Sequence, residues 1–289
     1  LRIQEPDGNI PPIIDPLTGR PVKQIDWPRL AFTAWALAEF GKALGEQGYL
    51  VTAEKSFGYL KRYILQNPES RIQNLELTLA YYGQLALTRG KVREATDAGM
   101  VIWQRLDRLA FEPITIAQIA SFFKVVSLMD ARFREPFQNL ARVLKEKFEE
   151  AMRSGQAMNL AVWAELVYTF ADIDPPFSEK VSAWLKKQQL PDGAFPESTV
   201  SDFAYTRGTS KIFEVLALDP EHNRSAIACV LPWLYSMQYD QENTFFVPEE
   251  HRARILRGFR HDYFNLECWI DAAGHTLLGA ARLNTHLWK

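Results

Sequence analysis

WLKKQQLPDGAFP, residues 184–196, ends one predicted helix and passes through a turn toward the next. The segment begins with Trp184 and Leu185 and reaches Gln189 four residues later. Gly193 follows after three further residues, and Phe195 ends the pattern as its second aromatic residue. The first half returns in WLYSMQYDQENTFF at 233–246, which lacks the Gly, and the second half matches QEPDGNIP at 4–11. A pattern that recurs along a chain indicates a repeated supersecondary unit.

Elsewhere the apolar residues recur at the three- and four-residue spacing of amphipathic helices, as at Leu75, Leu79 and Tyr82. Short breaks with Gly, Pro or Asp separate these stretches, and convincing strand alternation is missing from the sequence. Helices are therefore predicted at 27–46, 51–66, 70–89, 91–109, 114–129, 132–153, 157–171, 177–190, 203–218, 223–239 and 262–283. Antiparallel pairs of such helices would give an all-α fold.

The loops that match the repeat are each followed by Asp and an aromatic residue: Asp26-Trp27, Asp202-Phe203 and Asp262-Tyr263. Aspartate is a preferred N-cap, so each pair is predicted to open a helix. Residues 1–26 are rich in Pro, Gly and Asp and are predicted to be an extended, turn-rich leader. Because the match at 4–11 has no helix before it, we expect one domain over 1–289 that belongs to a longer chain and is possibly incomplete by part of a helix pair.

The 184–196 segment resembles the QW motif of the terpenoid cyclase and protein prenyltransferase superfamily. This resemblance implies an α/α toroid, in which six inner helices are ringed by six outer ones. The catalytic signatures of these families do not carry over to the chain. The acidic Asp-x-Asp-Asp motif has only Asp172-Ile173-Asp174 as its nearest match, and the Asp-Asp-x-x-Asp, Asp-x-Cys and thioester motifs are missing.

Three classes of function stay open on these grounds. The first is an enzyme whose central cavity binds an anionic organic substrate, which resembles the terpenoid cyclase-like toroids. The second is a carbohydrate-active α/α toroid, a lyase, hydrolase or epimerase that acts on acidic sugars. The third is a non-catalytic recognition or structural toroid within a larger protein, with other domains of the chain as partners.

Parallel inner helices would place their positive N-termini at one mouth of the toroid, which suits anions. Arginines fall at or near the predicted helix starts, and guanidinium groups bind carboxylate or phosphate through paired hydrogen bonds. These arginines, predicted to bind substrate, are Arg29, Arg71, Arg207 and Arg260. Tyr205 should point at the same mouth, and the aromatic residues Tyr82 and Trp163 could line the cavity, although aromatic residues at helical spacing also form cores.

The last predicted helix is apolar and rich in small residues apart from a row of polar groups. Glu267, Asp271 and His275 follow one another at four-residue spacing, and His261 lies just before the helix. A carboxylate beside an imidazole can act as a general acid/base pair, so these four are the predicted catalytic residues. No cofactor and no metal are predicted, although the spacing of Cys268, Asp271 and His275 would also suit a zinc site. A hydrogen-bonded structural network is the alternative.

Composition excludes several partners. The chain carries 33 Lys and Arg against 35 Asp and Glu, so it lacks the basic excess that is typical of nucleic-acid binding. No apolar run approaches the roughly 20 residues that span a bilayer. With 47% hydrophobic residues the chain can bury a large core. A small-molecule or oligosaccharide substrate is the expected partner, and a soluble, cytoplasmic protein is favoured.

Overall fold

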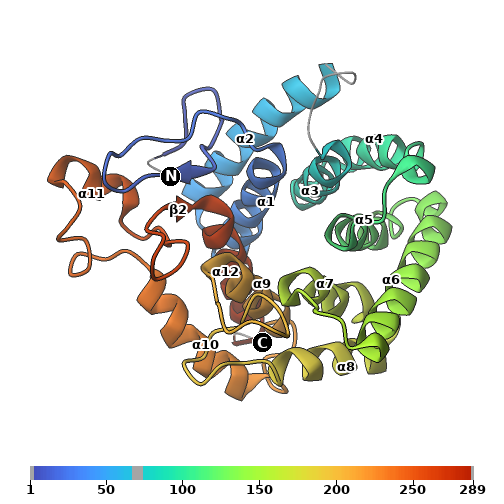
Figure 1. Cartoon of the computed structure of the whole chain (residues 1–289). Helices are drawn as coiled ribbons and strands as arrows, with labels where there is room; N and C mark the ends of the chain where they lie inside the picture. The colour runs from blue at the N-terminus through green and yellow to red at the C-terminus, as the bar shows by residue number, and fades with distance from the viewer. Residues whose placement is uncertain (1–2, 67–73, 288–289) are drawn as a thin grey trace.

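Six helices form a closed inner ring in the computed structural model, which describes residues 3–66 and 74–287 (Figure 1). Each inner helix packs against its two neighbours, and the last closes the ring against the first. The inner helices are α1 (Trp27–Leu44), α3 (Leu75–Thr88), α5 (Pro113–Val126), α7 (Leu160–Phe170), α9 (Thr206–Leu216) and α12 (Ile270–Leu287).

Five outer helices cover this ring, and each follows the inner helix on which it packs. They are α2 (Gln47–Gln66), α4 (Val92–Trp103), α6 (Arg134–Ser154), α8 (Pro175–Lys186) and α10 (Arg224–Met237). No outer helix follows α12 within the described residues. Figure 1 shows α11 (Glu249–Ile255) and the strand pair between α2 and α10 instead. The predicted all-α class and the α/α toroid are confirmed.

Two short strands are the exception to the helical content of the described residues. In this pair, β1 (Ile13–Ile14) runs antiparallel to β2 (Cys268–Trp269), so the segment before α1 is tied to the segment before α12. The predicted leader over 1–26 is therefore docked on the ring where the structure describes it. Two 3-10 helices, Leu106–Arg108 and Ala131–Phe133, complete the elements.

The division into layers follows from the helix surfaces. On α1 every residue from Leu30 to Ala38 is buried, because small and apolar side chains surround the helix on all sides. The outer helix α6 instead buries one stripe, which includes Phe137, Leu144 and Phe148, and exposes its charged residues. A helix that is apolar on all sides is expected in the interior, and α1 accordingly belongs to the inner ring.

The 184–196 loop, which connects α8 to α9, is bound to the outer helix α10 through Gln189. Its side-chain nitrogen donates to the carbonyl of Gly193 at 2.9 Å and to that of Ala226 on α10 at 3.0 Å. Gly193 has a φ of +94°, and a Cβ atom there would collide with the carbonyl of Cys229 on the same helix. Only glycine therefore permits this close approach of the loop to α10.

The matching loop at 4–11 has the same arrangement at the other end of the chain. Gln4 donates to the carbonyl of Gly8 at 3.4 Å and to that of Thr52 on α2 at 2.8 Å. Gly8 has a φ of +105°, and its missing Cβ leaves room for the carbonyl of Lys55. Two segments with a shared sequence pattern thus make the same contacts with the outer helix that follows.

Several predicted boundaries are wrong. Helix α11 was expected as loop, and α12 begins at Ile270 rather than near 262. Asp26 caps α1 as predicted, by accepting a hydrogen bond from the backbone of Arg29. Asp262 accepts from Phe264 and Asn265 within a turn, so it caps no helix. The strand pair explains the late start of α12, because its backbone hydrogen bonds hold Cys268–Trp269 extended.

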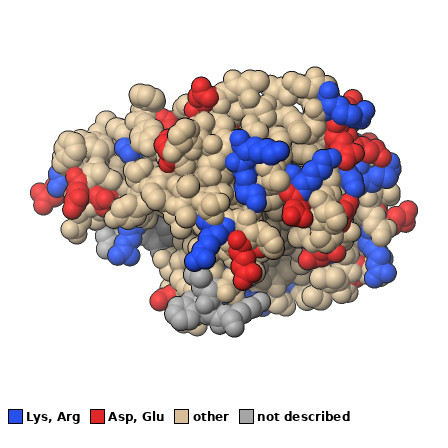
Figure 2. All heavy atoms as spheres, turned by 90° about the horizontal axis from the view of Figure 1, so that it is seen from below, with Lys and Arg blue, Asp and Glu red and all other residues tan. Residues whose placement is uncertain are grey.

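The outer face differs in charge between helices. Figure 2 shows Lys, Arg, Asp and Glu gathered in the middle and at the right of that face, whereas the area to the left of the middle is largely uncharged. Leu231 and Tyr235 are exposed apolar side chains of α10. None of the helices in the described part of the chain combines the length and apolar character needed to cross a bilayer.

We predict that Gln189→Ala lowers the free energy of unfolding by about 1–3 kcal/mol, because it removes both hydrogen bonds of a partly buried amide and leaves two carbonyls without that donor. Urea denaturation measures the loss. Gln188→Ala is the matched control, since the structure gives its side chain no hydrogen bond within the described residues. Equal effects of the two variants would contradict the role assigned to the loop.

Candidate functional site

Charged side chains meet in the centre of the ring, between α9 and α12. Helix α12 carries Asp271, His275 and Arg282, and α9 carries Lys211 and Glu214. Residues three or four apart share one face of a helix, so Asp271 and His275 point to the same side of α12. Because α9 and α12 pack against each other, their polar faces lie opposite one another.

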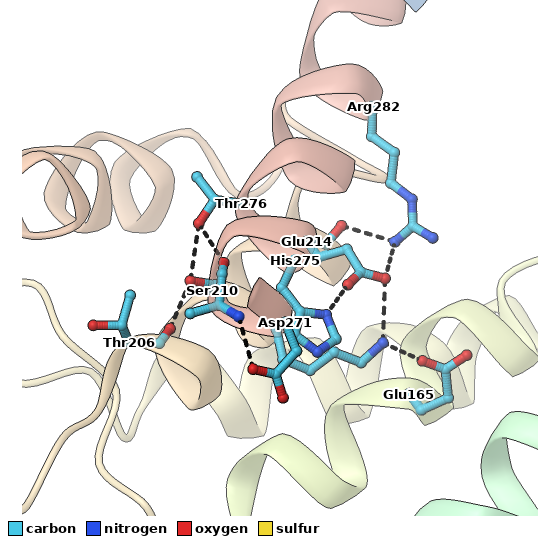
Figure 3. A network of polar contacts seen from close by, with 10 residues as sticks. Glu165, Thr206, Ser210, Glu214, Asp271, His275, Thr276 and Arg282 are labelled. Atoms are coloured by element: carbon cyan, nitrogen blue, oxygen red, sulfur yellow. Dashed lines mark hydrogen bonds and ion pairs between the residues drawn. The ribbon is translucent and has the colours of Figure 1, made fainter. Parts of the chain in front are cut away.

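Glu214 is the hub of this network (Figure 3). One carboxylate oxygen contacts Lys211 Nζ at 3.2 Å and the Arg282 guanidinium at 3.1 Å, and the other contacts His275 Nδ1 at 2.5 Å. The side chain of Glu214 is only 1% exposed. Burial opposes ionisation, but the two cations and the imidazole outweigh it and hold the pKa of Glu214 well below its usual range.

The network continues onto α7 and α5. Lys211 also pairs with Glu165 of α7, and both side chains are nearly inaccessible to solvent. Glu165 accepts a hydrogen bond from the hydroxyl of Ser121 on α5 at 2.5 Å, and that hydroxyl lies 2.9 Å from Thr169. Lys211 therefore bridges two carboxylates, and four of the six inner helices contribute to a single polar cluster.

His275 is held as an oriented base. Its Nδ1 faces the ionised carboxylate of Glu214, so the tautomer that satisfies this contact carries its hydrogen on Nδ1. Burial is the main cause that lowers the pKa of His275, which keeps the ring neutral near pH 7. The Nε2 atom then presents a lone pair, and the structure gives it no hydrogen-bond partner within the described residues. An imidazole oriented by a buried carboxylate in this way can accept a proton from a substrate.

Asp271 gathers two arginines at the N-terminal mouth of the ring. Its Oδ2 atom lies 3.1 Å from Arg29 Nε and 3.5 Å from Arg207 Nη1, and Arg29 also pairs with Asp26 at 3.3 Å. Arg29 lies over the ring of Trp269 at 4.2 Å. The side chain of Arg207 remains 38% exposed, so its guanidinium can still bind an anion that reaches the mouth.

Two other predicted residues lie beside this mouth. Tyr205 precedes α9, where its ring stacks on His261 at 5.5 Å and lies 5.7 Å from the Arg207 guanidinium. The Nδ1 atom of His261 contacts Asp262 at 2.7 Å. His261 and Trp269 also have their ring centroids 4.3 Å apart. The four predicted residues Arg29, Arg207, Tyr205 and His261 are therefore brought together around one opening.

The predicted row on the last helix is only partly present. Glu267 precedes β2 and binds Trp269 Nε1 at 3.1 Å and Asn265 Nδ2 at 3.3 Å, so it does not share a helix face with Asp271 and His275. Cys268 belongs to β2, and burial raises the pKa of its thiol to about 12. Within the described residues no three His, Cys, Asp or Glu side chains form a metal-binding group, so zinc at Cys268, Asp271 and His275 is not supported.

Three predicted ligand residues, Arg260, Tyr82 and Trp163, lie elsewhere in the structure. Arg260 donates to the carbonyl of Ser236 and covers Tyr263, away from the mouth arginines. Arg71 falls outside the described residues. Tyr82 stacks on Phe57 of α2, and Trp163 packs on Phe148 of α6, so both fill the layer between inner and outer helices. The inner aromatic side chain that contacts His275 is instead Phe32, which in turn contacts Trp35 and Tyr81.

The sequence interpretation missed Glu165, Lys211 and Glu214. A signal for them was present, because they lie within the helices predicted at 157–171 and 203–218, and a charged residue on a helix buried all round needs an ionic partner. Every residue of α9 is buried except Arg207. What the sequence could not supply is the pairing across helices, since the partners lie 46 and 61 residues apart.

Two surface grooves are found in the described part of the chain, and the first reaches Thr276, the residue after His275 on α12. One, of about 560 Å³, is lined mainly by α10 residues such as Leu231 and Tyr235, together with Phe259 and Thr276. The other, of about 500 Å³, lies along α6 and includes Arg134. The first has no ionisable residue other than a tyrosine. We place the candidate site at the ring centre because proton-transfer groups converge there.

Glu214→Gln should lower the free energy of unfolding by about 3–5 kcal/mol, because Lys211 and Arg282 would lose the carboxylate that balances them in the interior. Chemical denaturation gives the value. Glu146→Gln removes one partner of an exposed pair with Arg142 and should cost less than about 1 kcal/mol. If Glu214→Gln lowered the free energy of unfolding no more than Glu146→Gln does, water would reach Lys211 and Arg282 more freely than their burial indicates.

Acidification should destabilise the protein in two stages. The folded-state pKa values of His275 and Glu214 are both lowered, so the unfolded chain binds more protons as the pH falls. The His275 contribution begins near its ordinary pKa of 6.5, and the Glu214 contribution begins near 4.5. Urea denaturation across this range should show a flatter upper stage in His275→Gln.

His222→Gln is the control for that experiment. His222 is an exposed histidine whose pKa is raised by Asp219, so its contribution to stability has the opposite sign. Its replacement should not flatten the upper stage. If His275→Gln leaves the pH dependence of unfolding unchanged, the imidazole is not held neutral by burial.

The toroid is shared with enzymes of different chemistry. The chain is similar to a novel α-amylase from Clostridium perfringens, with a TM-score of 0.62 and 12% identity over 97% of this chain and 94% of that chain. It is also similar to two variants of the type II terpene cyclase MstE from Scytonema in complex with the substrate geranylgeranyl dihydroxybenzoate. Their TM-scores are 0.59 and 0.53, both at 13% identity, over 99% and 90% of this chain and 94% and 86% of theirs. No protein-family model and no curated protein matches the sequence. At these identities the similarity shows the fold alone.

Proposed function

We propose that the protein is an enzyme that binds an anionic organic substrate at the N-terminal mouth of the ring and moves a proton with His275. The observation that carries this proposal is the 2.5 Å contact between His275 Nδ1 and the ionised, buried Glu214. Such a contact fixes the imidazole and leaves Nε2 as the reacting atom. The side chain of His275 retains 10% exposure, so the ring is not sealed from solvent.

The position of the arginines supports an anionic substrate. Arg207 precedes Lys211 by one helical turn on α9, as Asp271 precedes His275 on α12. One turn corresponds to a rise of about 6 Å along each helix. A carboxylate bound by Arg207 or Arg29 would therefore place neighbouring atoms of the same molecule within reach of Nε2. The structurally similar terpene cyclase was solved in complex with geranylgeranyl dihydroxybenzoate, a substrate that is named as a carboxylate and is therefore an anionic organic ligand.

The charge state of the centre favours proton abstraction over alkene protonation. Protonation of an isoprenoid alkene needs a carboxylic acid that stays protonated until the substrate arrives. Here Glu214 contacts Lys211, Arg282 and His275, and its pKa is lowered. Glu165 is paired with Lys211 as well. Glu214 is therefore not suited to donate a proton, and this separates the proposal from terpenoid cyclisation.

A second candidate is a carbohydrate-active enzyme for acidic sugars. The specific support is the combination of Arg207 with the neutral His275. Arg207 contacts Asp271, and His275 lies one helical turn after Asp271 on α12. In a uronic acid the hydrogen next to the carboxylate is acidic once that carboxylate is bound by a cation. Abstraction of this hydrogen needs a base such as His275, as in lyases or epimerases.

The substrate class can be tested by thermal shift against two panels, isoprenoid diphosphates and uronic-acid oligosaccharides. A ligand that binds the native state raises the melting temperature by mass action. We expect a shift with the uronic acids, and we expect Arg207→Gln to weaken that ligand about 10- to 100-fold through loss of a charged hydrogen bond. Arg142→Gln, on the exposed face of α6, is the control.

His275→Gln should keep most of the binding but lower turnover roughly 10²- to 10⁴-fold, the usual contribution of a general base. Turnover of the ligand that gives the largest shift is the measurement. A shift with neither panel would favour the non-catalytic toroid. Unchanged turnover in His275→Gln would remove the imidazole from the mechanism.

A further inference from the structure

The outward face of α12 lacks the cover that the other inner helices have. Each of those five is followed by an outer helix that packs on it, and no outer helix follows α12 within the described residues. Ala273, Leu277 and Ala280 share the face of α12 that points away from His275. These three side chains are only partly buried, whereas α1 buries every residue from Leu30 to Ala38. A surface that a helix covers elsewhere in the ring is therefore still open here.

The neighbouring outer helix α10 presents an uncharged, apolar wall to this opening. The groove of about 560 Å³ extends from α10 to Phe259 and to Thr276 of α12. Leu231 and Tyr235 line it from α10, and Tyr235 is 69% exposed. Among the 14 residues of α10 only Arg224 is charged, whereas α6 carries charged residues along its exposed side. Adjoining apolar side chains on a solvent-facing surface are typical of an interaction site.

Two arginines mark the ends of the α10 wall. Arg224 precedes Leu231 by seven residues and Tyr235 by eleven, so the three share one face of α10. Arg260 lies at the other end of this helix, where it donates to the carbonyl of Ser236 at 2.8 Å. The Nε atom of Arg260 is buried without a hydrogen-bond partner, and neither arginine has a carboxylate partner within the described residues. The apolar wall is thus flanked by two cations whose charge is not balanced by an ion pair.

We propose that this groove binds an amphipathic helix of a partner protein, which takes the position of a sixth outer helix. The apolar stripe of that helix would cover Leu231 and Tyr235, as in other complexes in which a helix lies in a groove. Ser236 follows Arg224 by 12 residues, a rise of about 18 Å along the helix. Acidic residues in the first and last turns of the partner helix would therefore reach both arginines.

The charges favour such a partner over a second copy of this chain. Two α10 helices packed face to face would bring their apolar residues together, but α10 contains no Asp or Glu. Arg224 and Arg260 would then lack carboxylate partners in the interface as well. The interaction is separate from the chemistry at His275, because the groove holds no group of the proposed function.

The test measures fluorescence anisotropy of a labelled synthetic helical peptide of about four turns, with Leu at i, i+3, i+4 and i+7 and Glu in the first and last turns. A second peptide carries Lys in place of Glu. We expect saturable binding of the Glu peptide and binding of the Lys peptide that is at least about 10-fold weaker. Arg224→Glu should reduce this preference, since it reverses one charge at the end of the groove.

Leu231→Glu should weaken the Glu peptide about 10- to 100-fold, because it replaces an apolar contact with a like charge. Met152→Glu is the matched control, since Met152 of α6 is an apolar residue of similar exposure on another outer helix. Thermal unfolding should show that both variants are folded. Lack of saturable binding, or equal effects of the two variants, would overturn the proposal. A dimer that Leu231→Glu abolishes would instead make a second copy the occupant.

Discussion

The ionised carboxylate of Glu214 is the group on which the centre of the ring depends. A charge that is 1% exposed is strongly unfavourable unless opposite charges and hydrogen bonds surround it. Lys211, Arg282 and His275 provide these contacts from α9 and α12, and Lys211 extends them to Glu165 on α7. Three inner helices are thereby fixed in register by one carboxylate, and the histidine is fixed with them.

The same constraint selects the chemistry available to the centre. Cations that stabilise Glu214 also keep it from acting as an acid, so the centre contains a neutral base and lacks a protonated carboxyl among these groups. The reaction that we propose there therefore begins with removal of a proton. The toroid itself does not impose this outcome, because the fold is similar in an α-amylase and in a terpene cyclase. The side chains on the inner helices decide it.

Sequence patterns predicted the architecture better than the site. The helical spacing of apolar residues and the two Gln-to-Gly loops predicted the helix pairs of the toroid. Both patterns depend on residues that are close in the sequence, so the sequence alone is enough to recognise them. Asp271 and His275 were correctly placed on one helix face by their spacing. Glu267 was misplaced because β2 pairs with β1, a contact between segments more than 250 residues apart. Glu214 was missed for the same reason, since only the packed ring shows that His275 faces it.

In the proposed function, the mouth and the centre would act on one molecule, and the geometry of α12 would set their separation. Asp271 holds Arg29 and Arg207 by one oxygen atom, so it positions two guanidinium groups and neutralises only part of their charge. Asp26 balances Arg29 from the rim, and this leaves the half-exposed Arg207 as the cation that an entering anion meets. Because Asp271 and His275 are four residues apart on a rigid helix, the anion site and the base keep a fixed separation. A substrate whose reactive hydrogen lies further from its charge than this separation would bind at the mouth without reaching Nε2.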